Sequence, residues 1–64
     1  MTAVIYKNNT IYAYNNNYYV RTTHEENGIH VTLIGEMTNE FDDVDQVQVY
    51  DNGQLIINQR RDND

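Results

Sequence analysis

Apolar and polar side chains alternate with a period of two residues along most of the chain, and no helical stripe is sustained. Because side chains on a strand point alternately to opposite faces, this pattern predicts β-strands joined by tight turns. The clearest signal lies at Asn52-Gly53, which two apolar runs flank within residues 44–60. Asn-Gly suits a type I′ turn, so we expect a β-hairpin. Its two-residue loop predicts the pairs Asp51–Gln54, Val49–Ile56, Val47–Asn58 and Asp45–Arg60.

Two further hairpins are expected nearer the start of the chain. Asn27-Gly28 separates the alternating runs 18–23 and 29–34 and predicts a second type I′ turn. Asn8-Asn9 separates residues 3–6 from residues 10–14 and is a weaker signal for the same turn. For the Asn27-Gly28 hairpin the expected pairs are Glu25–His30, His24–Val31 and Arg21–Ile34.

Residues 35–43 are the one stretch without alternation. A helical turn near residues 38–43, capped by Thr38 or Asn39, and a plain acidic loop are both compatible with this stretch. The sequence therefore predicts an all-β fold of about six short antiparallel strands in three hairpins. A curled meander, a small barrel and a sheet completed by a dimer remain open, and the 44–60 hairpin, apolar on both faces, is expected inside a sandwich, barrel or dimer. We expect one domain over residues 1–61 and a frayed tail at residues 62–64.

The composition indicates the compartment in which we expect the chain to act. Its 64 residues include no cysteine, which indicates no disulfide or thiolate metal site and a reducing compartment, so we expect a cytoplasmic protein. The opening residues lack a secretory signal pattern, and no apolar run is long enough to cross a membrane. Small domains often gain stability by association, so a homodimer stays open.

Charge is the most informative feature of the composition. The net charge is −6, and between Thr22 and Gln59 the chain has carboxylates but no lysine or arginine. An acidic block of this kind repels nucleic acid and anionic lipid, and it attracts basic protein surfaces. Neither direct nucleic-acid binding nor membrane binding is expected. The block consists of Glu25, Glu26, Glu36, Glu40, Asp42, Asp43, Asp45 and Asp51.

No motif predicts a metal or a cofactor. His24 and His30 lie near Glu25 and Glu26, but the predicted register puts the two histidines on opposite faces. At most one histidine and one or two carboxylates would then converge. We expect Glu25 and His30 to form an ion pair that raises the pKa of His30. The three glycines are scattered, which argues against a phosphate-binding loop.

Catalysis is not expected either. The chain has no serine and no cysteine, and its adjacent carboxylates would point to opposite faces of a strand. If Met1 were removed, Thr2 could in principle act as an N-terminal nucleophile. The rest of such a site is missing, so an ordinary strand start is the preferred interpretation.

The remaining hypothesis is a small non-enzymatic inhibitor that docks an acidic face on a basic groove of a nucleic-acid-handling protein. In size and charge the chain is similar to bacteriophage anti-defence and host-takeover proteins, including DNA mimics and anti-CRISPR proteins. Phe41 would be either an anchor within this surface or part of the core. The alternative is a structural or assembly protein that acts by strand pairing or homo-oligomerisation. The expected contact residues are Glu36, Glu40, Phe41, Asp42, Asp43 and Asp45, with Glu25 and Glu26 as an extension.

Overall fold

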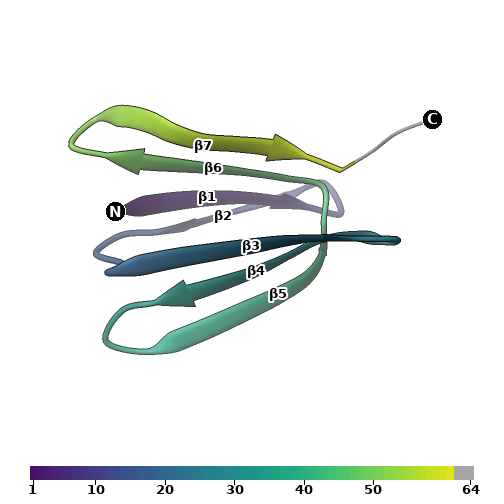
Figure 1. Cartoon of the computed structure of the whole chain (residues 1–64), viewed down its shortest axis with the longest axis horizontal. Helices are drawn as coiled ribbons and strands as arrows, with labels where there is room; N and C mark the ends of the chain where they lie inside the picture. Colours follow the sequence, from purple (N-terminus) through teal and green to yellow (C-terminus); the bar gives the residue numbers. More distant parts are fainter. Residues whose placement is uncertain (62–64) are drawn as a thin grey trace.

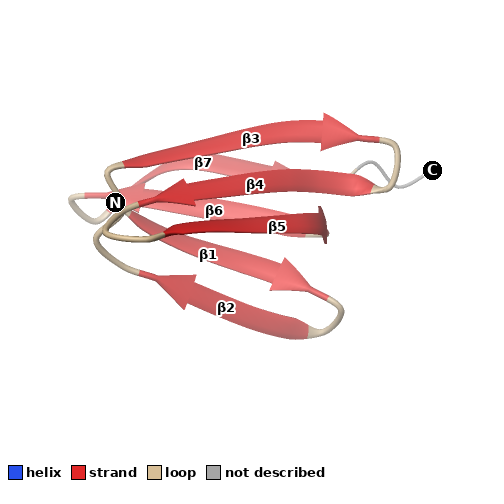
Figure 2. Cartoon of the chain, turned by 90° about the horizontal axis from the view of Figure 1, so that it is seen from below, coloured by secondary structure: helices blue, strands red, loops and turns tan. Residues whose placement is uncertain are grey.

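The computed structural model describes residues 1–61, which form seven strands in two antiparallel sheets (Figure 1). The sheets lie face to face as a sandwich, with strand orders β2-β1-β6-β7 and β3-β4-β5 (Figure 2). The all-β prediction is confirmed, and the tail predicted at residues 62–64 lies outside the described residues. No helix within residues 1–61 has the length and apolarity needed to cross a bilayer. The strands are β1 Thr2–Lys7, β2 Thr10–Tyr14, β3 Tyr19–Glu25, β4 Gly28–Ile34, β5 Thr38–Val44, β6 Gln46–Asp51 and β7 Gln54–Arg60.

The first and third hairpins form at the predicted turns. Asn8 and Asn9 have φ angles of 51° and 63°, and Asn52 and Gly53 have φ angles of 52° and 77°. Two consecutive positive φ angles are what a type I′ turn requires, and asparagine and glycine adopt them at low cost. The local turn chemistry is thus enough to place these two hairpins.

The register of the β3–β4 hairpin differs from the prediction by two residues. The turn lies at residues 26–27, Glu25 pairs with Gly28, and His30 pairs with Thr23. The predicted pairs are wrong because Gly28 belongs to β4, where its φ is 148° and its Cα faces the backbone of β5. A shift of two residues keeps every side chain on its predicted face, so Glu25 and His30 still share one side.

The register of the β6–β7 hairpin is broken by a bulge. Asp51 pairs with Gln54 as predicted, but Val49 pairs with Ile57 because the ladder shifts between Val49 and Tyr50. The extra residue, Ile56, is 48% exposed, whereas Ile57 packs against the core. A bulge of one residue moves each following side chain to the other face, which the turn sequence alone does not reveal. The predicted pairs Val49–Ile56, Val47–Asn58 and Asp45–Arg60 are therefore wrong.

The stretch expected to be a helical turn or an acidic loop is strand β5, which pairs along β4. Phe41 pairs with Val31, and Val44 pairs with Ile29. Two residues of β5, Asp42 and Asp43, therefore stand opposite the single residue between Val31 and Ile29 on β4. Asp43 has a positive φ of 56°, as expected for a bulge residue. The bulge breaks the alternation on which the sequence prediction depended, so the helical turn is wrong.

One apolar core lies between the two sheets. Both sheets contribute alternate residues to it, and most of its members are β-branched side chains that suit a pleated surface. Phe41 closes one side, where its ring lies 5.3 Å from that of Tyr12 and 5.6 Å from that of Tyr14. The buried core residues are Ala3, Ile5, Val20, Ile29, Val31, Leu33, Val44, Val47 and Val49.

Candidate functional site

The three-stranded sheet and the connections between its strands carry most of the acidic block. Six of the eight carboxylates of the acidic block lie within residues 18–44. This segment contains β3, β4, β5 and their connections, and Arg21 is its only lysine or arginine. Alternation turns one side of this sheet to the core, and the other side presents polar residues to solvent. We call that solvent side the acidic face. Its outward positions include Tyr19, Arg21, Thr23 and Glu25 on β3, His30, Thr32 and Ile34 on β4, and Thr38, Glu40 and Asp42 on β5.

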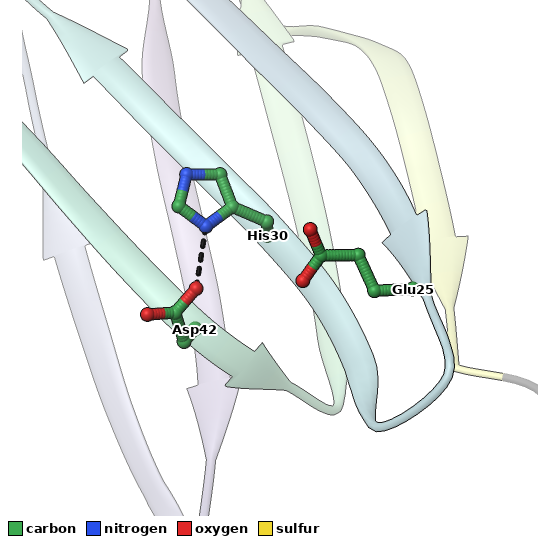
Figure 3. Close-up of side chains that lie close together, drawn as sticks. All are labelled: Glu25, His30 and Asp42. Carbon is green, nitrogen blue, oxygen red and sulfur yellow. Dashed lines mark hydrogen bonds and ion pairs between the residues drawn. The ribbon is translucent and has the colours of Figure 1, made fainter.

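His30 lies in the middle strand of this face, among three carboxylates. Its Nδ1 atom is 2.6 Å from Oδ1 of Asp42, and its Nε2 atom is 3.1 Å from Oε1 of Glu40. Glu25 approaches from β3 on the other side, as Figure 3 shows together with the His30–Asp42 contact. We call Glu25, His30, Glu40 and Asp42 the His30 cluster. The β5 bulge brings Asp42 to His30. The two closest partners of His30 therefore come from β5, the strand that the sequence did not predict.

The carboxylates favour the charged imidazole. The hydrogen bond to Asp42 is the largest cause of the raised pKa of His30, followed among the raising effects by the hydrogen bond to Glu40. The charges of Asp42 and Glu25 add smaller contributions, and partial burial opposes the shift. The predicted direction is confirmed, although the main partner is Asp42 rather than Glu25.

The same cluster contains groups that ligate metals. Glu25, His30 and Asp42 each offer a ligand atom, and these atoms lie within 4.8 Å of one another. This group of one histidine and two carboxylates is the largest that the sequence predicted, and Glu40 contacts His30 without belonging to it. A proton competes with a metal ion for the imidazole of His30, since metal binding needs neutral imidazole and the raised pKa favours imidazolium. A single nitrogen ligand among exposed carboxylates also differs from a closed structural zinc site.

Three predicted contact residues lie at the margins of the acidic face. Glu26 is exposed in the β3–β4 turn, at the same end of the sheet as His30. Glu36 is exposed in the connection between β4 and β5, at the opposite end. Asp43 is exposed in the bulge beside Asp42. The structure therefore gathers Glu25, Glu40 and Asp42 but spreads these three around them.

Asp45 lies where the chain crosses from β5 to β6, and its contacts are structural. Its side chain accepts a 2.8 Å hydrogen bond from Nη1 of Arg61 and a 3.2 Å hydrogen bond from the backbone N–H of Asn8. The contact with Arg61 is the main cause of the lowered pKa of Asp45. Arg61 also donates to the carbonyl of Asn27. Asp45 thus ties the first turn and the end of β7 together instead of joining the acidic face.

Phe41 does not lie on the acidic face. It pairs with the buried Val31 and packs against the core, so its ring points away from the side that carries Glu40 and Asp42. The interpretation of Phe41 as a core residue therefore agrees with the structure better than its interpretation as a binding anchor.

An exposed apolar pair outside the predicted contact residues lies on the acidic face instead of Phe41. Tyr19 and Ile34 are cross-strand partners on the outward side of β3 and β4, and they are 54% and 37% exposed. The signal was present in the sequence, since both residues fall at the outward positions of alternating strands. The predicted register paired Ile34 with Arg21 and so concealed the contact.

Comparison of the chain with family models, with curated proteins and with solved structures finds no match. The geometry of the acidic face and the charge distribution are therefore the basis for a functional proposal.

Proposed function

We propose that the chain is a small non-enzymatic inhibitor that docks its acidic face on a basic groove of a nucleic-acid-handling protein. The supporting observation is that one side of the three-stranded sheet combines Glu25, Glu40 and Asp42 with the exposed pair Tyr19 and Ile34. Aromatic side chains supply contact area at low entropic cost, and carboxylates supply charge complementarity to lysine and arginine.

The spacing of the carboxylates supports a groove that normally holds phosphates. Glu40 and Asp42 are two residues apart on one strand, so their positions repeat at roughly 7 Å, the rise of two strand residues. A row of negative groups on a rigid sheet resembles a nucleic-acid backbone to a basic surface, because phosphate contacts dominate nucleic-acid affinity. The inhibitor would occupy the groove and exclude the nucleic acid.

His30 limits the charge of this face in a pH-dependent way. Its imidazolium form offsets one of the three surrounding carboxylates, and the deprotonated form leaves all three uncompensated. Docking on a basic groove is therefore strongest above the raised pKa of His30. The lack of cysteine agrees with action in the cytoplasm, as for small phage proteins that act inside a bacterial host.

The test is capture from a bacterial lysate, followed by elution with a salt gradient and mass spectrometry. Tagged wild type is compared with a neutralised variant that carries Glu25→Gln, Glu40→Gln and Asp42→Asn. We expect wild type to retain a nucleic-acid-binding protein that elutes with salt, and the neutralised variant to lose it, because docking depends on charge.

A control variant with the same change in net charge separates the face from the overall charge. Asp51→Lys with Asn58→Lys adds the same positive charge at exposed positions of the four-stranded sheet. We expect this control to retain the partner. Equal loss in both variants would show a non-specific charge effect. Equal retention of the same partner in both variants would contradict docking through the acidic face.

A further inference from the structure

The four outer strands of the two sheets differ in how they are protected from pairing with another chain. Exposed strand edges invite pairing, and proteins block them with charges, bulges or proline. β5 has a bulge and three carboxylates, and β7 has a bulge and Arg60. β3 carries Arg21 and Glu25. Each of these three edges therefore has at least one such protection.

β2 has none of them. Its sequence is Thr-Ile-Tyr-Ala-Tyr, without charge, proline or glycine, and its ladder with β1 runs over five residue pairs without a bulge. Its first four residues are exposed, and Ile11 is 64% exposed. Within residues 1–61, β1 is the one strand that pairs with β2. The other edge of β2 is thus a regular, uncharged template for a further strand.

The surroundings leave this edge accessible. In Figure 2, β2 lies at the margin of its sheet, beyond β5 of the facing sheet. Phe41 of β5 packs on Tyr12 and Tyr14 and so covers the inward side of β2. Because those contacts lie between the sheets, they stiffen β2 without covering its edge.

The charge distribution selects a second copy of this chain as the occupant. The acidic face would repel another acidic face, but its carboxylates lie on the other sheet, and Lys7 is the only charged residue in β1 and β2. An edge that is uncharged and apolar is complementary to itself, whereas a basic partner is drawn to the acidic face instead.

We propose that β2 pairs antiparallel with β2 of a second copy and joins the two four-stranded sheets into one eight-stranded sheet. A two-fold axis at Tyr12 sets Ile11 opposite Ala13 of the second copy. The dimer places both acidic faces away from its interface, so this assembly is independent of the inhibitory function proposed above.

The test is sedimentation velocity over micromolar to millimolar protein concentration. We expect wild type to pass from monomer to dimer. Ile11→Lys with Ala13→Lys sets like charges opposite each other across the axis and should raise the dissociation constant at least about tenfold. The control, Leu55→Lys with Ile56→Lys, changes two exposed apolar residues on the other edge strand of the same sheet and should leave it unchanged.

Hydrogen exchange of the wild-type protein gives a second readout that needs no variant. Amides of β2 should become more protected as concentration rises, while amides of β3 at the edge of the other sheet should not. A monomer at every concentration would overturn the proposal. So would a dimer that the β7 control breaks and the β2 variant leaves intact, or protection that rises at β3 instead of β2.

Discussion

His30 shows how one side chain gains its properties from residues distant in the sequence. Both ring nitrogens contact carboxylates of β5, and the side chain of His30 is 26% exposed. The sequence indicated a raised pKa because the predicted register set Glu25 beside His30. It did not identify Asp42 as the main partner, because that contact depends on a strand and a bulge that the pattern did not reveal.

We expect His30→Gln to lower the free energy of unfolding in a pH-dependent way. Since folding raises the pKa of His30, its contribution to stability is complete below the unfolded value near 6.5 and fades as pH rises through the folded value. We expect the variant to lose about 0.2–1 kcal/mol of unfolding free energy near pH 5.5, the range of exposed cross-strand pairs. Urea unfolding at several pH values measures this difference.

His24→Gln is the matched control for this prediction. His24 is exposed on β3 and pairs with Ile29, so it occupies the opposite side of the sheet from His30. Its substitution should change stability little and should not reproduce the pH profile. A His30→Gln defect that grows as pH rises would contradict the ion-pair account of the cluster.

At the scale of elements, the turns and the strands were predictable to different degrees. Asn8-Asn9 and Asn52-Gly53 form the expected turns because their φ angles are a local property of the residues. The bulges in β5 and β7 depend on packing across the sandwich, so the register predicted at Val49 is wrong and β5 was not predicted. Regular alternation reveals strands, and one extra residue is enough to hide it.

We expect the close contact of β4 with the β5 bulge to make Gly28→Ala destabilising. A Cβ added at Gly28 would lie 3.0 Å from the Cα of Asp43 and 3.0 Å from the carbonyl oxygen of Val44, in a backbone with φ of 148°. Gly28→Ala therefore combines steric overlap with backbone strain. We expect a loss of about 2–5 kcal/mol, since the backbone strain costs about 1–2 kcal/mol and the steric overlap about 1–3 kcal/mol. Urea unfolding provides the measurement.

Gly53→Ala separates the two effects. Gly53 also has a positive φ, of 77°, but an added Cβ would meet no atom within 4 Å. This control should lose only the free energy of unfolding that the backbone strain costs, about 1–2 kcal/mol. If both variants lose the same stability, the close approach of Gly28 to the bulge does not contribute.

At the scale of the molecule, the two sheets differ in the charge of their exposed surfaces. The three-stranded sheet holds the His30 cluster and the exposed pair Tyr19 and Ile34, whereas the edge strand β2 of the other sheet is uncharged. The sequence predicted an acidic surface, and the structure gathers part of it on one face. It also removes Asp45 and Phe41 from that surface, because one bridges elements and the other packs on the core.

The most direct measurement is competition between duplex DNA and the wild-type protein for the captured basic partner. Fluorescence anisotropy of labelled DNA bound to the partner reports displacement as wild-type protein is added, at fixed salt and at a pH above the raised pKa of His30. We expect wild type to release the DNA, the variant neutralised at Glu25, Glu40 and Asp42 to leave it bound, and the charge-matched control to release it. Simultaneous binding of DNA and wild-type protein, or equal release by the neutralised variant, would contradict the claim that the acidic face occupies the nucleic-acid groove.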